Sequence, residues 1–150
     1  MAGAKPKVFL DASVLIAAVL SSSGGSFYIL NKFKGDYEFQ TNAYVFEEVE
    51  SVLERKFPGR EDLRNKLFLL LGLTPVRILP DPPRESVTHL TALINPEDAP
   101  ILASALAHSS YLLTLDKDFF SESVITLSNT KGLLILKPKE FIEKHRGRRP

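Results

Sequence analysis

Short apolar segments alternate with longer, helix-like segments along nearly the whole chain, and this alternation constrains the fold most. The apolar segments have the length of buried strands and lie at residues 7–10, 37–40, 75–79, 111–115 and 133–136. Parallel strands need long crossover connections, usually helices, and their burial on both faces makes them read as apolar runs. The alternation therefore predicts a three-layer α/β fold, in which a mostly parallel five-stranded sheet carries helices on both faces.

The helix-like segments begin and end near residues that commonly cap helices. They cover residues 13–20, 26–33, 43–57, 61–71, 85–94, 96–108 and 138–145. Asn42 is expected to cap the third helix, and Gly72 to end the fourth. Asn95 and Pro96 are expected to be the cap and the first residue of the sixth. After the fourth strand, the sequence is assigned only a turn, at residues 117–120.

The composition is that of one soluble globular domain. The chain has 150 residues, of which 44% are hydrophobic and 25% charged, and it contains no cysteine. Disulfides and thiolate zinc sites are thereby excluded. We expect residues 1–136 to form the main body and residues 137–150 to add a C-terminal helix and a basic tail to the same domain. That tail carries a net charge of +4 and either contacts phosphates or is simply solvated.

No segment has the pattern of a membrane anchor. The longest apolar stretches, residues 8–20 and 66–73, are shorter than the ~20 residues that a bilayer span requires, and the first contains Asp11. The N-terminus also lacks the long apolar run of a signal peptide. We therefore expect a cytoplasmic protein without a membrane partner.

Acidic residues stand at positions where a parallel sheet would bring them together. Asp11 and Asp116 each follow a predicted strand, and sites in such folds lie beyond the carboxyl ends of the strands. Asp98 lies at a helix start, on the side that should face the sheet. In the helix at 43–57, Glu48 and Glu50 border the apolar face, and the helical pattern does not distinguish them.

Each of these acids also has a purely structural explanation. Asp11 could cap the following helix, Asp116 could cap the turn after it, and Asp98 could reach back to the Asn95 backbone. Together, however, the acids predict a cluster of carboxylates, which needs a counter-charge. A site made only of oxygen atoms suits Mg²⁺ or Mn²⁺, and these ions commonly serve phosphate chemistry. The sequence contains no P-loop or dinucleotide-binding motif and no H-E-x-x-H zinc motif.

Four segments, in this order and spacing, resemble the PIN-domain family. They read VFLDASVLI, FEEVESVLERKF, PEDAPILASALA and LLTLDKDF. The resemblance spans about residues 7–136 and is greatest to the small single-domain members that include VapC-type toxins. One departure is Leu115, where many members carry glycine; it is expected to stiffen that turn without removing a ligand.

The resemblance implies which residues form the site. It assigns catalytic roles to Asp11, Glu48, Asp98 and Asp116, and so favours Glu48 over Glu50. It implies that Asp11, Asp98 and Asp116 hold one or two Mg²⁺ or Mn²⁺ ions, with Glu48 and Asp118 bound directly or through water. Asp118 is equally compatible with a simple helix-start acid. Ser13 and Thr114 are implied to orient water or a phosphate oxygen.

The implied activity is metal-dependent hydrolysis of RNA, with this chain as the toxin of a toxin–antitoxin pair. Such proteins are often homodimers and are held inactive by a small antitoxin. The apolar helices at 26–33 and 61–71 either pack in the core or offer a surface to such a partner. The alternative function is a non-catalytic module of the same fold that binds RNA or protein. Retention of every acid argues against that alternative, because binding alone would not place negative charge against phosphates.

Overall fold

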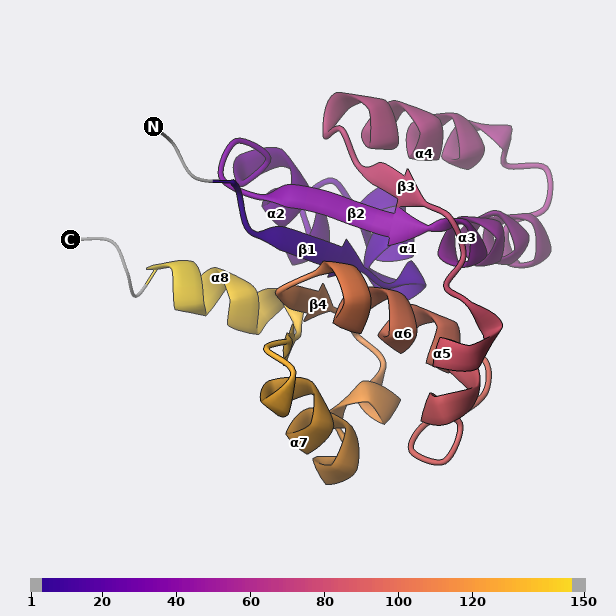
Figure 1. Cartoon of the computed structure of the whole chain (residues 1–150). Helices are drawn as coiled ribbons and strands as arrows, with labels where there is room; N and C mark the ends of the chain where they lie inside the picture. The colour runs from indigo at the N-terminus through magenta and orange to yellow at the C-terminus, as the bar shows by residue number, and fades with distance from the viewer. Residues whose placement is uncertain (1–3, 147–150) are drawn as a thin grey trace.

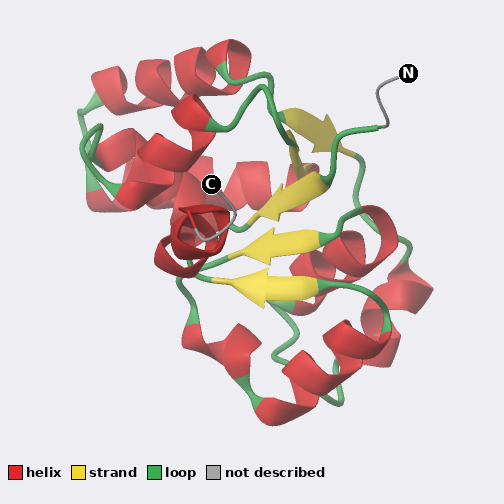
Figure 2. Cartoon of the chain, turned by 90° about the vertical axis from the view of Figure 1, so that its left-hand side faces the viewer, coloured by secondary structure: helices red, strands yellow, loops and turns green. Residues whose placement is uncertain are grey.

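A central sheet of five parallel strands forms the middle layer of the computed structural model, which describes residues 4–146. The strands are β1 (Lys7–Leu10), β2 (Glu38–Asn42), β3 (Arg77–Leu79), β4 (Tyr111–Leu113) and β5 (Leu134–Leu136). Their order across the sheet is β3-β2-β1-β4-β5, and every neighbouring pair is parallel. The predicted α/β fold with a parallel five-stranded sheet is thus confirmed (Figure 2).

Helices cover both faces of this sheet (Figure 1). They are α1 (Ala12–Leu20), α2 (Gly25–Lys32), α3 (Ala43–Lys56), α4 (Glu61–Leu73), α5 (Arg84–Leu90), α6 (Ala99–His108), α7 (Glu122–Thr130) and α8 (Pro138–Arg146), with the short 3-10 helix η1 (Lys117–Phe120) before α7. α6 packs on β1 and β2 from one side, and α1 and α2 lie behind the sheet in the same view. The strands between these layers are apolar, and Phe9, Phe39 and Leu112 are fully buried.

Three helix boundaries differ from the expectation by two residues or more, and the first is the end of α5, which lies at Leu90 rather than at Ile94. α4 continues through Gly72 to Leu73, because the Thr74 hydroxyl and N–H both donate to the Leu70 carbonyl and close the last turn. α6 begins at Ala99 rather than at Pro96. The Asn95 carbonyl accepts the N–H groups of Asp98 and Ala99, so residues 95–98 form a separate turn before the helix.

The sequence interpretation missed α7 entirely. The Ser121 hydroxyl accepts the Val124 N–H at its start, and Gly132 follows its end with φ of 80°. Glycine is favoured at such a left-handed position because it has no Cβ. The serine cap and the glycine stop were therefore available as signals for this helix.

The C-terminal helix α8 packs on α2 and β5. Phe141 is buried there, edge-on to the rings of Phe33, Tyr37 and Tyr111. Residues 147–150, which carry the last two arginines of the predicted basic tail, lie outside the described residues. Within residues 4–146, no single helix is long and apolar enough to cross a membrane; only α1 and α2 taken together, with a 94° bend between them, reach that length and composition.

Candidate metal centre

The carboxyl ends of β1 and β4 bring acids from distant parts of the chain to one edge of the sheet. β1 and β4 are neighbours, and the Asp11 N–H donates to the Leu113 carbonyl (3.1 Å). Asp11 therefore lies next to Thr114, and Asp116 follows two residues later. α6 packs on β1 and β2 and places Asp98, at its N-terminal end, toward this edge.

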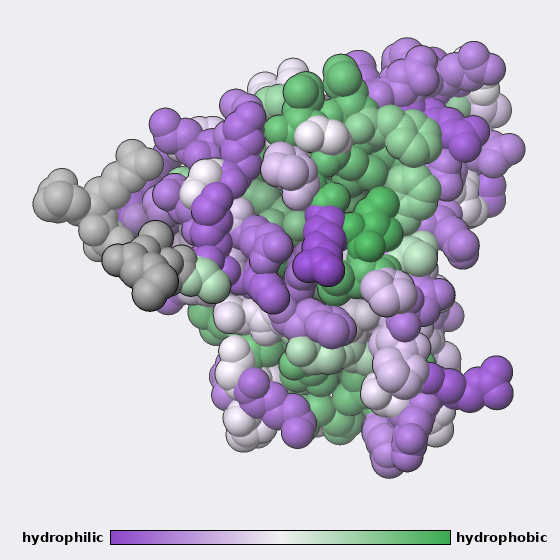
Figure 3. All heavy atoms as spheres, turned by 45° about the horizontal axis from the view of Figure 1, so that its top comes forward, coloured by the Kyte–Doolittle hydropathy of each residue, from purple (hydrophilic) through white to green (hydrophobic). Residues whose placement is uncertain are grey.

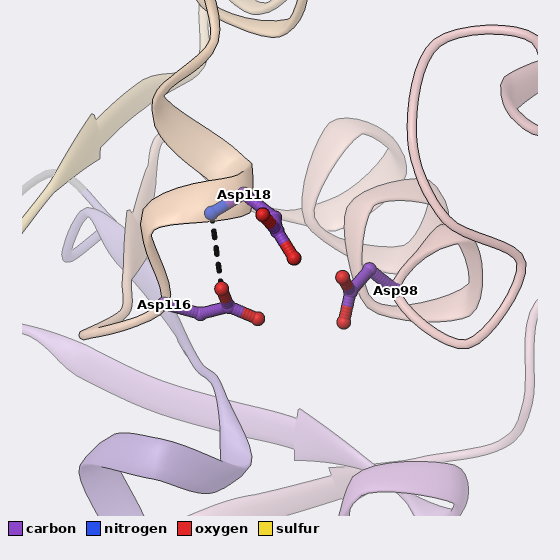
Figure 4. Close-up of side chains that lie close together, drawn as sticks. All are labelled: Asp98, Asp116 and Asp118. Carbon is purple, nitrogen blue, oxygen red and sulfur yellow. Dashed lines mark hydrogen bonds between the residues drawn. The ribbon is translucent and has the colours of Figure 1, made fainter.

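Three aspartates form the centre of the cluster. Asp98, Asp116 and Asp118 point toward one another from the start of α6 and from η1 (Figure 4). One carboxylate oxygen from each lies within 4.8 Å of the others. Asp116 also accepts the Asp118 N–H (3.0 Å), so it caps η1 while its second oxygen remains available. The turn role and the cluster role of Asp116 thus coexist.

Asp11 lies deeper than these three residues and is only 4% exposed. Its Oδ1 accepts the Ala12 N–H (2.8 Å), which caps α1, and its Oδ2 accepts the hydroxyls of Ser13 (2.9 Å) and Thr114 (2.6 Å). Burial raises the pKa of the Asp11 carboxyl above its ordinary value, the three hydrogen bonds lower it, and the charge of Asp116 raises it further. The structure thus brings Asp98, Asp116 and Asp118 within 4.8 Å of one another, and Asp11 lies alongside as a buried neighbour whose charge acts on Asp98.

The two hydroxyl residues connect Asp11 to the loop that carries Asp116. Ser13 Oγ accepts the Leu115 N–H (3.0 Å), and Thr114 Oγ1 accepts the Asp116 N–H (3.0 Å). Each hydroxyl thus donates to Asp11 and accepts from the loop backbone. The Leu115 side chain is apolar and 48% exposed, so it adds no ligand atom to the cluster.

Burial and like charges act together on the Asp98 carboxyl. Its pKa is raised to about 7, first by burial and then by the charges of Asp116, Asp11 and Asp118, while a hydrogen bond with the Asn95 side chain lowers it. The Asp98 carboxylate caps no N–H of α6, and the hydrogen bonds described for these residues include none from the Asn95 N–H to that carboxylate. The acid is therefore free to face the cluster.

Glu48 and Glu50, the two candidate glutamates of α3, have different surroundings. Glu50 forms an ion pair with Arg64 of α4 (3.0 Å). Glu48 lies on the cluster side: partial burial raises its pKa, followed by the charges of Asp11, Asp116 and Glu97, whereas Arg55 lowers it. The helical pattern alone could not separate these residues, whereas the structure pairs Glu50 with α4 and places Glu48 near the aspartates.

The donor set of this centre suits a hard divalent cation. All of its ligand atoms are carboxylate oxygens, which Mg²⁺ and Mn²⁺ prefer. In the part of the chain that the structure describes, the ion pairs are Arg60–Asp62 and Arg64–Glu50, and neither involves the cluster. The repulsion between the carboxylates is therefore not relieved by a lysine or an arginine, and a cation between them would relieve it.

The sequence interpretation missed two residues at the rim. The Tyr44 hydroxyl donates to the Glu97 carbonyl (2.7 Å), and burial together with Glu48, Asp98 and Glu97 raises the pKa of that hydroxyl. Asn95 donates to Asp118 Oδ2 (3.1 Å). Nothing in the local sequence points to Tyr44, and the role of Asn95 was obscured by its resemblance to a helix cap.

Comparisons with known proteins agree with this fold. A search of curated proteins finds no match. Among solved structures, the chain is similar to VapBC2 from Rickettsia felis, crystallised bound to a DNA fragment from their promoter (TM-score 0.66, 16% identity, covering 87% of this chain and 98% of that one). It is also similar to PAE2754 from Pyrobaculum aerophilum (TM-score 0.67, 19% identity, covering 97% and 100%). At these identities, the likeness shows the fold.

The family assignment comes from the sequence itself. The family model described as "PIN domain" matches residues 8–122, which is most of the chain and includes every acid of the cluster. PIN domains are generally nucleases. The predicted resemblance is confirmed: the chain belongs to the PIN-domain family.

Proposed function

We propose that this protein is a metal-dependent endoribonuclease that hydrolyses RNA phosphodiester bonds. The observation that carries the proposal is the meeting of Asp98, Asp116 and Asp118 within 4.8 Å, at the sheet edge where sites of α/β folds lie, without a basic partner among the described residues. A scaffold that only bound RNA would gain nothing from this negative charge.

The residues divide into ligands and supports. Mg²⁺ or Mn²⁺ bound by Asp98, Asp116 and Asp118, with Asp11 as a further ligand, would neutralise phosphate charge and supply a water of lowered pKa. Glu48, at the rim, is coupled to the same charges and contacts this site directly or through water. Ser13 and Thr114 fix Asp11 and the backbone at residues 115–116, and we assign them this positioning role in addition to orienting water or a phosphate oxygen.

Cleavage of a labelled single-stranded RNA tests the proposal. We expect cleavage with Mn²⁺ or Mg²⁺, none with EDTA, and at least ~100-fold slower cleavage by Asp116→Asn, because ligand loss costs at least as much as loss of a supporting residue. Asp36→Asn, at an exposed acid between α2 and β2, is the matched control and should cleave normally. If the protein binds RNA in Mn²⁺ but does not cleave it, the nuclease proposal is wrong, and the alternative function of a non-catalytic RNA-binding module is supported.

We further propose a small antitoxin as a partner, in keeping with the VapC-type resemblance. Support comes from a groove of about 440 Å³ between α1, α2 and α4. Exposed apolar side chains line it, among them Leu20, Leu69 and Leu73, and its charged lining residues are Lys34 and Lys66. A segment with apolar and acidic side chains fits this lining. A second copy placed groove to groove would bring the lysines together, so we assign the homodimer contact to another surface.

The remaining assignments follow from this role. A toxin that cuts cellular RNA would act in the cytoplasm. We assign residues 1–136 to the nuclease domain, and residues 137–150 to a helix and a basic tail of the same domain, available to contact RNA phosphates. The family match at residues 8–122 and the packing of α8 on α2 and β5 are compatible with this division.

A further inference from the structure

Asn95 is the one neutral side chain that binds into the three-aspartate cluster of the described chain. It lies in the turn before α6, where its carbonyl accepts the N–H groups of Asp98 (2.9 Å) and Ala99 (3.0 Å). These two bonds fix its backbone relative to Asp98. Its side-chain amide donates to Asp118 Oδ2 (3.1 Å), and the same side chain lowers the pKa of Asp98. Asn95 therefore connects acids of two separate elements, α6 and η1.

An amide is well suited to this position. The NH₂ group offers two hydrogens without a positive charge, so it can bridge two carboxylates without competing for them as a lysine or arginine would. The other acids already have supports: Ser13 and Thr114 hold Asp11, and Asp116 accepts the Asp118 N–H. The Asp118 carboxylate is exposed, and the hydrogen bond that the structure describes for it comes from the Asn95 side chain. Without it, repulsion would turn Asp118 away from Asp98.

We infer that Asn95 is a positioning residue, which holds the carboxylates of Asp98 and Asp118 in the orientation that a divalent cation requires. The inference rests on the proposed metal-dependent function, and it concerns a residue that contacts the ligands rather than the ion. Oxygen ligands of Mg²⁺ or Ca²⁺ lie ~2.0–2.6 Å from the ion, so carboxylates that are already convergent lose less freedom on binding. Partners of this kind commonly contribute 10–100-fold to metal affinity.

Mn²⁺ affinity measured by titration calorimetry on the full chain tests the inference without any RNA. We expect Asn95→Ala to bind Mn²⁺ about 10-fold more weakly than the unsubstituted chain. Asn65→Ala is the matched control, because Asn65 is an exposed residue of α4, and its Mn²⁺ affinity should be unchanged. The thermal midpoint of metal-free Asn95→Ala should remain close to that of the parent, since both backbone bonds of Asn95 are retained. An unchanged Mn²⁺ affinity in Asn95→Ala would overturn the inference.

A double-mutant cycle separates positioning from general damage to the turn. If Asn95 acts through Asp118, Asn95→Ala should have less than about a twofold effect on Mn²⁺ affinity once Asp118→Asn is present. The same 10-fold loss in both backgrounds would mean a general structural effect and would also overturn the inference. If the unsubstituted chain binds no Mn²⁺, the proposed metal site is wrong, and so is the proposed function. If the unsubstituted chain binds Mn²⁺ and Asn95→Ala binds it equally well, only the positioning role of Asn95 is wrong.

Discussion

The charge of a single residue, Asp98, couples the site to the stability of the protein. Its pKa is about 7 in the folded chain against 3.8 for an ordinary aspartate, mainly because of burial and then because of Asp116, Asp11 and Asp118. Between these two values, the folded protein retains a proton that the unfolded chain has released. The free energy of unfolding contributed by this group therefore falls as pH rises through that window. Burial shifts the pKa values of Asp11 and Glu48 in the same direction.

We predict that Asp98→Asn stabilises the metal-free protein at high pH. Removing the charge should raise the thermal midpoint at about pH 8 by roughly 2–4 °C, the change produced by ~1 kcal/mol in a domain of this size. At about pH 5, where the native carboxyl is protonated, the variant should differ little from the parent. Calorimetry in EDTA measures both values, with Asp36→Asn as the control for loss of an exposed acid. An equal effect at the two pH values would contradict the coupling.

At the scale of residues, the sequence predicted the acids better than it predicted their contacts. Asp11 and Asp116 were recognisable because each follows an apolar strand segment, and parallel strands end at one edge. The hydrogen bonds of the buried Asp11 carboxylate could not be predicted in the same way. Their donors are the hydroxyls of Ser13 and Thr114, and Thr114 is 103 residues away in the sequence. The bridge from Asn95 to Asp118 likewise depends on how η1 turns beside α6.

At the scale of elements, Asn42 ties together the two helices that carry Glu48 and Asp98. Its Oδ1 accepts the Val45 N–H at the start of α3 (2.9 Å), as the sequence predicted. Its Nδ2 donates to Ser104 Oγ (2.8 Å) and to the Pro100 carbonyl (3.3 Å), both in α6. The side chain is fully buried, so one residue serves as a helix cap and as an inter-helix contact.

We predict that Asn42→Ala lowers the free energy of unfolding by about 2–4 kcal/mol, combining the loss of a cap with buried groups left unpaired. Because α3 and α6 lose their common contact, the affinity for Mn²⁺ should fall as well. Urea denaturation and calorimetric titration measure the two effects. Asn129→Ala, at the exposed end of α7, is the control and should change neither quantity. A destabilised variant with unaltered Mn²⁺ affinity would show that the helices hold their acids independently.

The elements that the sequence interpretation placed wrongly are those whose ends depend on neighbours. α4 passes Gly72 because Thr74 closes its last turn, and an added Cβ at Gly72 would meet no atom within 4 Å. α6 starts late because residues 95–98 form their own turn around the Asn95 carbonyl. α7 is short and fully buries only Val124 and Ser128, so few apolar residues mark it in the sequence.

For the whole molecule, alternation of strands and helices was sufficient to predict a parallel sheet, whereas the strand order was not predictable from it. Any order of five parallel strands satisfies the same apolar pattern. The observed order places β1 between β2 and β4, and that adjacency is what brings Asp11 to Thr114. The site therefore depends on a property of the whole sheet.

The apolar surface around α4 is also a property of the whole molecule. The groove beside it is lined by α1, α2 and α4, and α4 is far from the other two in the chain. Phe68, Leu69 and Leu73 of α4 are between 49% and 64% exposed, and Ile78 of β3 is 44% exposed. Figure 3 shows hydrophobic side chains gathered on the face that α4 occupies. The sequence left open whether α4 packs in the core or serves a partner, and the helix does both: Leu63 and Leu67 are buried while this row remains exposed.

We predict that replacing Leu69 and Leu73 by glutamate prevents binding of a small antitoxin encoded beside this chain's gene. Two acidic groups would remove apolar contact and repel acidic side chains that Lys34 and Lys66 attract, so affinity should fall by at least about 100-fold, or ~2.7 kcal/mol. Both leucines are more than 60% exposed, so the variant should fold normally. Leu93→Glu, at an exposed residue outside the groove, is the control. Co-expression followed by calorimetry of the purified chains measures the effect, and unchanged affinity in the double variant would place the partner elsewhere.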